Sequence, residues 1–221
     1  MMVSVVIPAF NEAATVAAAI AAVKAELPEA QVVVVDDGSK DRTSKAAAGA
    51  DRLIRHLKNQ GKAAAIVTGC RAASGEIIAM VDADMAWQAG EITKLVDVVK
   101  SGQGDMAVAV FSHSQGGGLG LVRGLATWGI RLLTGRTLQA PLSGQRAAKR
   151  DVLAHCLPRW GGFGLETELS IRVLRRGYTV VEVPTVFVHQ GHGWTPKGFR
   201  HRGRQFIHIL FALLRGGLGR G

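Results

Sequence analysis

The stretch Ile77-Ile78-Ala79-Met80-Val81-Asp82-Ala83-Asp84 decides which fold the sequence predicts. The apolar residues 77–81 predict a buried strand of a parallel sheet. Asp82 and Asp84 follow at the carboxyl end of that strand, where ligands bind in open α/β sheets. Two acids this close repel each other unless a cation or a shared proton joins them, so they indicate a divalent metal that carries a phosphate group. Taken alone, they are equally consistent with a solvated acidic turn.

The residues before this stretch alternate between expected strands and expected helices. Strands are predicted at 3–7, 32–35 and 52–55, and helices at 11–27, 41–48 and 61–74. This alternation predicts an α/β fold with a mostly parallel central sheet and right-handed crossovers. Asn11 is expected to cap the first helix, and Ser39 the second.

Polar side chains follow three of these strands. Asn11 and Glu12 follow the first strand, Asp36 and Asp37 the second, and Asp82 and Asp84 the fourth. Because the carboxyl ends of parallel strands meet at one edge of a sheet, these groups are expected to gather there, which favours a ligand site over a solvated turn. The first turn, 8–12, has no glycine and is therefore not a dinucleotide-binding loop. Phe10 in that turn suits stacking on a nucleoside base, with plain core packing as the alternative.

The second half of the chain is less regular. Expected elements are a strand at 105–111, a glycine-rich lid or linker at 112–120, a helix at 119–134, a turn or short edge strand at 141–146, a helix at 151–157, and strands at 180–183 and 185–188 around Pro184. Glu166 and Glu168 lie two residues apart on a further helix, where side chains diverge, so at most one of them faces a site.

The charge of the chain predicts an anionic partner. The formal net charge is +10 and the pI about 10.3, which suits nucleotide phosphates, nucleic acid or an anionic membrane surface. Residues 197–221 are basic, carry no acid, and include the apolar run 205–214. This tail is expected to lie in a membrane interface, or to pack on the domain or on a second copy. Arg123 and Arg131 are expected either at an acceptor phosphate or on the solvated surface.

Cysteine usage and apolar runs bear on the compartment. Cys70 and Cys156 have no metal-type spacing and are predicted to be reduced core residues of a cytoplasmic protein. Residues 1–8 lack the charged region of a signal peptide, and no apolar run reaches the ~20 residues that a membrane span needs.

Several motifs in order then point to a known family. They are residues 5–12, 35–43, 59–63 and 81–84, followed by 143–146, 166–169, 176–178 and 182–184. Together they resemble family 2 glycosyltransferases, and the later ones are similar to the dolichol-phosphate mannosyltransferase branch. The resemblance implies a three-layer, Rossmann-like GT-A domain at 1–196, with a nucleotide-binding half at 1–100 and an acceptor half at 101–196. The basic amphipathic C-terminal helix at 197–221 would follow it.

The resemblance also implies roles for individual residues. The nucleotide-sugar pocket would comprise Pro8, Ala9, Phe10, Glu12, Asp37, Lys62, Asp82, Ala83 and Asp84. Asp82 and Asp84 would hold Mg²⁺ or Mn²⁺ with the donor diphosphate, and Glu166 stands where many members carry the catalytic base. The acceptor or its phosphate would meet Ser143, Gly144, Gln145 and Arg146.

Two features depart from the mannosyltransferase pattern. Ala86 stands where that branch has a glutamine that can join the metal shell, so His189, or with less support His192, is expected to supply the missing ligand. The stretch 141–144 is similar to glucosyl-3-phosphoglycerate synthases, which retain the anomeric configuration. Inverting and retaining outcomes therefore both stay open at this point.

The sequence thus predicts transfer of a sugar from a UDP- or GDP-linked donor to a polyprenyl phosphate or a small phosphorylated acceptor. The expected location is the cytoplasm or the inner face of the membrane, with a homodimer left open. A nucleotide-sugar binding protein without transferase activity and a soluble glucosyl-3-phosphoglycerate-synthase-like enzyme are the alternatives. A nucleic-acid partner is not expected, because the acidic strand ends would repel its phosphates.

Overall fold

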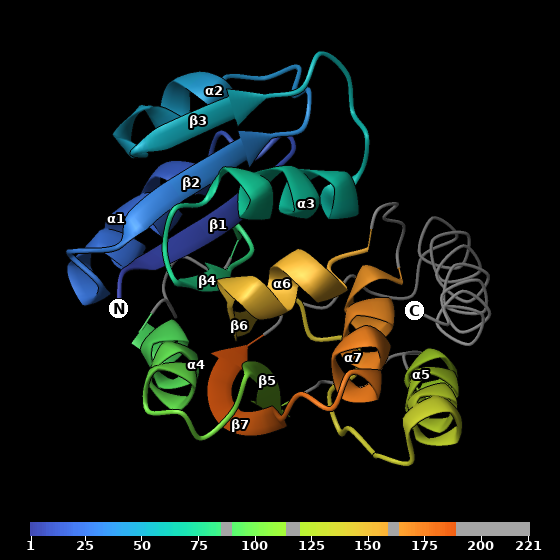
Figure 1. Ribbon diagram of the computed structural model, residues 1–221. Coiled ribbons are helices and arrows are strands. Elements are labelled where there is room, and N and C mark those ends of the chain that lie inside the picture. Colours follow the sequence, from blue (N-terminus) through green and yellow to red (C-terminus); the bar gives the residue numbers. More distant parts are fainter. Residues whose placement is uncertain (85–89, 114–119, 159–163, 189–221) are drawn as a thin grey trace.

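One seven-stranded sheet runs through the protein. The computed structural model describes residues 1–84, 90–113, 120–158 and 164–188. The strand order is β3-β2-β1-β4-β6-β5-β7 (Figure 1). The strands are β1 (Val3–Ala9), β2 (Gln31–Asp36), β3 (Arg52–Arg55), β4 (Ile77–Met80), β5 (Met106–His113), β6 (Arg146–Lys149) and β7 (Val180–Val188). All neighbours pair in parallel except β6, which is antiparallel to both β4 and β5, so the mostly parallel sheet predicted from the sequence is confirmed.

Helices cover both faces of the sheet and make three layers. They are α1 (Val16–Glu26), α2 (Thr43–Ala46), α3 (Lys62–Ala72), α4 (Gly90–Lys100), α5 (Gly120–Thr134), α6 (Arg150–Cys156) and α7 (Leu165–Arg175), with a short 3₁₀ helix at Ala47–Gly49. One face packs against α1 and α4, and the opposite face against α3, α6 and α7. α5 packs on the outer side of α7 and forms its own small core there. Strands from both predicted halves share the one sheet.

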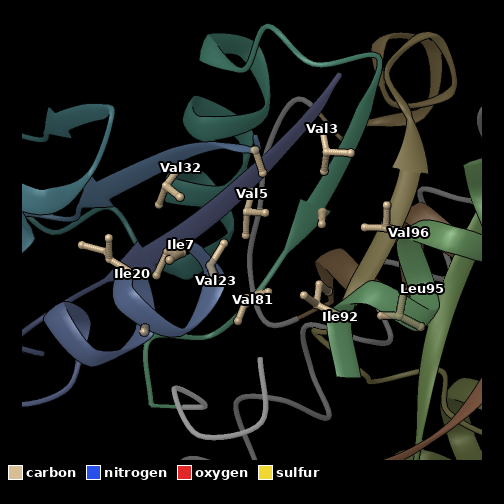
Figure 2. Packing of buried hydrophobic residues seen from close by; sticks show 14 of the residues in the cluster. Val3, Val5, Ile7, Ile20, Val23, Val32, Val81, Ile92, Leu95 and Val96 are labelled. Carbon is tan, nitrogen blue, oxygen red and sulfur yellow. The ribbon is translucent and has the colours of Figure 1, made fainter. Parts of the chain in front are cut away.

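The core explains why the strands read as continuous apolar runs. In β1, Val5 and Ile7 pack toward α1 and α4, while Val6 between them packs toward α3, and all three are fully buried. Figure 2 shows Ile20 and Val23 of α1, with Ile92 and Leu95 of α4, on the first of these faces. A strand buried on both faces needs apolar residues at every position rather than at alternate ones.

Both cysteines are free and buried, in keeping with the core role predicted for them. Cys70 of α3 packs on the sheet, and burial raises the pKa of its thiol to about 12. Cys156 lies in the same core layer, on α6. Thiols so protected from ionisation have little nucleophilic character.

The predicted helix caps are wrong. The first helix begins at Val16 after Thr15, and Asn11 lies outside it with a positive φ of 57°. The Asn11 side chain accepts a hydrogen bond from the Lys40 amide at 3.0 Å, and the Ser39 hydroxyl accepts one from the Asn11 amide at 2.9 Å. Both side chains therefore tie the β1 loop to the β2 loop and do not cap a helix.

Two strand predictions in the second half also need correction. Residues 141–146 were expected to form a turn or a short edge strand, and a turn does lie at 141–142, but Arg146 begins an unpredicted central strand, Arg146–Lys149, between β4 and β5. Its short, alanine-containing sequence carries little strand signal, and its place comes from pairing on both sides. Residues 180–188 form one strand, not two, because β7 lies at the sheet edge, where the missing N–H of Pro184 is tolerated.

Some predictions fall outside the described residues. These are most of the predicted lid, with residues 114–119, and the whole basic tail at 197–221. Among the helices that are described, none combines the length and the apolar character that crossing a bilayer requires.

Candidate active site

The carboxyl ends of β1, β2 and β4 meet at one edge of the sheet, as predicted. Ala9 at the end of β1 is in register with Asp36 at the end of β2. The Asp37 amide donates to the Ala9 carbonyl at 2.8 Å, and the Val81 amide donates to the Val6 carbonyl at 3.0 Å. The polar residues that follow these strands are therefore brought to one edge.

The β1 loop presents one aromatic ring at this edge. Phe10 is 42% exposed, whereas Pro8 and Ala9 are buried in the strand below it. The Glu12 amide donates to the Thr43 hydroxyl at 2.8 Å, which fixes the loop. The exposed ring suits stacking on a flat base, while Pro8 and Ala9 support the loop from beneath.

Asp37 organises the loop that leads into α3. Its carboxylate is 2% exposed and accepts hydrogen bonds from the amides of Gln60 at 2.9 Å and Gly61 at 2.7 Å. It also lies 2.6 Å from Nδ1 of His56, whose Nε2 is 3.0 Å from the Thr68 hydroxyl. Asp37 was predicted to line the nucleoside pocket. In the structure it fixes the start of α3, whose first residue is the next site residue.

Lys62 and Asp82 form an ion pair at the centre of the edge. Lys62 Nζ lies 2.6 Å from Asp82 Oδ1, and the two side chains are 46% and 22% exposed. Partial burial lowers the pKa of Lys62, but the carboxylates of Asp82, Glu166 and Asp84 outweigh it and leave the pKa raised. Lys62 is therefore a permanent cation at neutral pH.

Gly144 brings a second loop against this ion pair. A Cβ at this position would lie 3.0 Å from Lys62 Nζ and 3.3 Å from Asp82 Oδ2. The neighbouring Gln145 is buried, and its side-chain oxygen accepts a hydrogen bond from the Asp82 amide at 3.3 Å. The hydroxyl of Ser143 is also buried and has no hydrogen-bond partner among the described residues.

Glu166 faces the same centre from the first turn of α7. Burial raises the pKa of its carboxyl, and the cations of Lys62 and Arg146 oppose this rise without cancelling it. Glu168 turns away and accepts a hydrogen bond from Arg172 at 2.7 Å. The two glutamate side chains thus diverge, as their two-residue spacing predicts. A carboxyl with a raised pKa is suited to taking a proton.

Arg146 does not lie open to an acceptor phosphate, contrary to expectation. Its guanidinium is 1% exposed and donates to the carbonyls of Ser143 at 2.7 Å and Pro141 at 3.1 Å, and to the Ser170 hydroxyl at 2.8 Å. Ser170 in turn donates to the Glu166 carbonyl at 2.8 Å. Burial lowers the pKa of Arg146 to about 10, so it stays charged at neutral pH. The arginine joins the Gly144 loop to α7.

Arg146→Met is therefore expected to lower the free energy of unfolding by about 3 kcal/mol, because the buried carbonyls of Ser143 and Pro141 lose a charged donor. Chemical denaturation measures this difference. Arg150→Met, at an exposed position close by, is the control and is expected to stay within about 0.5 kcal/mol of the unmodified protein. Equal stability of the two variants would show that the Arg146 hydrogen bonds do not hold the loop.

The donors fit the expected divalent metal. Asp82 and Asp84 offer hard carboxylate oxygens, and Mg²⁺ is commonly held by one or two carboxylates together with substrate phosphates. In the ranges that the structure describes, no group of three or more His, Cys, Asp or Glu side chains is placed to hold a metal ion. The predicted third ligand, His189, lies outside those ranges.

Sequence reasoning missed the residues that support the site. His56 and Thr68 complete the surroundings of Asp37, and Ser170 links Arg146 to α7. Glu182 accepts hydrogen bonds from the amides of Gln139 at 2.9 Å and Ala140 at 2.7 Å, which fixes the chain just before the Gly144 loop. These contacts join distant segments and carry no local spacing signal that could have revealed them.

Comparison with known proteins identifies the family of this chain. The family model "Glycosyl transferase family 2" matches residues 4–153. A dolichol-phosphate mannosyltransferase from Pyrococcus furiosus is 30% identical over 209 residues, which cover 87% of this chain and 58% of that protein. Glycosyltransferase AglJ from Haloferax volcanii is 27% identical over 197 residues, covering 86% of this chain and 64% of that protein. The chain thus spans less than two thirds of the length of these relatives.

Solved structures show the same fold. Glucosyl-3-phosphoglycerate synthase from Mycobacterium tuberculosis, in complex with Mn²⁺, UDP and phosphoglyceric acid, superposes with a TM-score of 0.80 and 26% identity. The match covers 100% of this chain and 80% of that one. A second complex of that enzyme, with Mg²⁺ and UDP, gives a TM-score of 0.81. The three-layer fold is thus the GT-A arrangement that the motifs implied, and the chain belongs to glycosyl transferase family 2.

Proposed function

We propose that this chain transfers a sugar from a nucleotide-diphosphate donor to a phosphorylated acceptor, with a divalent metal at Asp82 and Asp84. The observation that carries the proposal is the convergence of Lys62, Asp82 and Glu166 on one point beside Gly144. One permanent cation, one acid pair and one carboxyl of raised pKa are the groups that glycosyl transfer from a diphosphate requires.

The donor would lie along the edge formed by β1, β2 and β4. Phe10 offers an exposed ring for the base, and Glu12 and Asp37 lie in the two loops beside it. Mg²⁺ or Mn²⁺ supplies charge neutralisation for the leaving diphosphate. The Lys62 ammonium, which the surrounding carboxylates keep protonated, adds a second positive charge for the same phosphates.

The acceptor would enter on the side of Ser143, Gly144 and Glu166. When the acceptor is a hydroxyl, Glu166 takes its proton, for which a raised pKa is appropriate. When the acceptor is a phosphate oxygen, which is already nucleophilic, Glu166 orients it instead. Arg146 contributes by holding the Gly144 loop against α7 rather than by touching the acceptor.

Two acceptor classes are supported by different likenesses. The relative named as a dolichol-phosphate mannosyltransferase supports a polyprenyl phosphate, and the synthase structures with phosphoglyceric acid support a small soluble phosphate ester. We favour the polyprenyl phosphate because the later motifs of the chain are most similar to that branch. Transfer assays offering each acceptor in parallel separate the two.

The donor is tested by thermal unfolding in the presence of nucleotide sugars. A ligand that binds only the native state raises the melting temperature, by an amount equivalent to about 2.7 kcal/mol at 100 times its Kd. UDP- and GDP-linked sugars are each added with and without Mn²⁺. We expect nucleotide sugars of only one of the two bases to raise the melting temperature, and only when the metal is present. Upward shifts that ignore the base and the metal would contradict the proposed donor site.

A further inference from the structure

The exposed face of α5 carries an apolar stripe that the described part of the protein does not cover. Leu121, Trp128 and Leu132 are 84%, 60% and 66% exposed. Their spacing of seven and four residues places them along one side of the helix. The opposite side, with Val122 and Ile130 among its buried residues, packs against α7. The helix therefore has two apolar sides. One packs against α7 in the folded protein, and the other faces outward.

Two arginines of α5 lie beside this stripe. One described acid, Glu182, lies near the same loop, where it accepts hydrogen bonds from the amides of Gln139 and Ala140. Arg123 and Arg131 line a cavity of about 610 Å³ together with Trp128 and the loop 137–139. The chain has no Asp or Glu from residue 106 to residue 150. The cavity therefore combines two positive charges with one exposed indole ring.

We infer that this face of α5 docks on an anionic phospholipid membrane. An amphipathic helix with arginines beside Trp and Leu side chains lies in the interface plane, where the arginines meet lipid phosphates and the indole sits at the headgroup level. A protein partner of matching shape would have to bring its own acids, whereas an anionic bilayer supplies complementary charge along the whole helix. At 15 residues, α5 is too short to cross a bilayer.

The position of α5 would let a membrane contact bring the acceptor side of the site close to the bilayer. The helix packs on α7, which carries Glu166, and residues 135–142 connect α5 directly to the Gly144 loop. A membrane bound at α5 would lie beside the acceptor side of the site. The inference rests on the proposed function only for this use, because lipid binding itself needs neither donor nor acceptor.

Vesicle co-sedimentation of the full chain, without substrates, tests the docking. Vesicles of pure phosphatidylcholine are compared with vesicles of equal parts phosphatidylcholine and phosphatidylglycerol. Binding to the anionic vesicles is expected to fall about 25-fold in Arg123→Gln/Arg131→Gln, since each surface arginine contributes about fivefold. Leu121→Ser/Leu132→Ser is expected to weaken binding as well, without changing the charge.

The matched control removes two exposed arginines elsewhere, Arg71 on α3 and Arg150 at the start of α6. Arg71→Gln/Arg150→Gln lowers the net charge equally and is expected to keep most of the binding. Equal losses in both double variants would mean that net charge alone drives binding and would overturn the inference. Unchanged binding in the α5 variants, with all binding left to other segments, would overturn it too.

Trp128 reports directly on insertion. A variant that keeps Trp128 and replaces Trp87, Trp160 and Trp194 with Phe is expected to shift its emission to shorter wavelength on anionic vesicles and to be quenched by brominated lipid. Emission that does not respond to vesicles while the protein sediments with them would contradict docking through α5.

A concentration-dependent dimer that Trp128→Ser disrupts, with no vesicle binding, would assign the face to a second copy instead. If the unmodified protein binds vesicles but transfers no sugar from any donor tested, the proposed function is contradicted and the membrane docking of α5 is not.

Discussion

Asp84→Ala is expected to reduce sugar transfer about 1,000-fold, because several kcal/mol of charge stabilisation on the leaving diphosphate are lost with the metal. Asp84 follows Asp82 at the end of β4 and is exposed, so its carboxylate is available to a ligand. Its removal leaves the Lys62–Asp82 ion pair in place. The loss is measured as release of nucleoside diphosphate over a titration with Mn²⁺.

The control for this variant is Asp97→Ala, which removes an exposed acid from α4. It is expected to keep full activity and the same metal dependence. Both variants are expected to unfold within about 0.5 kcal/mol of the unmodified protein, since both side chains are exposed. Full, metal-dependent turnover by Asp84→Ala would contradict the assignment of the metal to the Asp82/Asp84 pair.

Glu166→Gln is expected to lower kcat by about 100- to 10,000-fold if the acceptor is a hydroxyl, which is the range for loss of a general base. The raised pKa of Glu166 predicts the accompanying pH dependence. The base acts when deprotonated, so kcat/KM of the unmodified enzyme rises with pH through a pKa above the 4.5 of an ordinary glutamate. The profile of Glu166→Gln is expected to lack this limb.

The same substitution is expected to leave the protein at least as stable as before, so a stability measurement distinguishes loss of the general base from misfolding of the variant. A carboxyl whose folded-state pKa is raised binds more protons in the folded state, so its contribution to stability falls as pH rises from the unfolded toward the folded pKa. At neutral pH the charged Glu166 therefore costs stability, and Glu166→Gln is expected to be at least as stable as the unmodified protein. A clear loss of stability would contradict this account of its surroundings.

Glu168→Gln is the matched control for that experiment. It lies two residues along the same helix and turns away from the site, and the substitution removes its ion pair with Arg172. Its kcat and pH profile are expected to stay near those of the unmodified enzyme. Equal losses in the two glutamine variants would place the effect in the helix rather than in a base at Glu166.

The sequence by itself determined the frame and the centre of the site. Continuous apolar runs such as Val32–Val35 indicate strands buried on both faces, and their alternation with helices predicts a parallel sheet. A parallel sheet places its carboxyl ends at one edge, so Asp37 and Asp82 had to come to the same region whatever the details of the loops. The divergence of side chains two apart on a helix predicted that at most one of Glu166 and Glu168 faces the site, but not which one.

Only the tertiary structure decided which polar residues face a ligand and which hold the loops. Arg146 and Asp37 occur in motifs beside exposed residues, yet both are buried, because each meets donors or acceptors from segments distant in sequence. β6 likewise exists because β4 and β5 pair with it on both sides. Local patterns fix periodicity and strand order along the chain, whereas burial and hydrogen-bond partners depend on which distant segments close around a side chain.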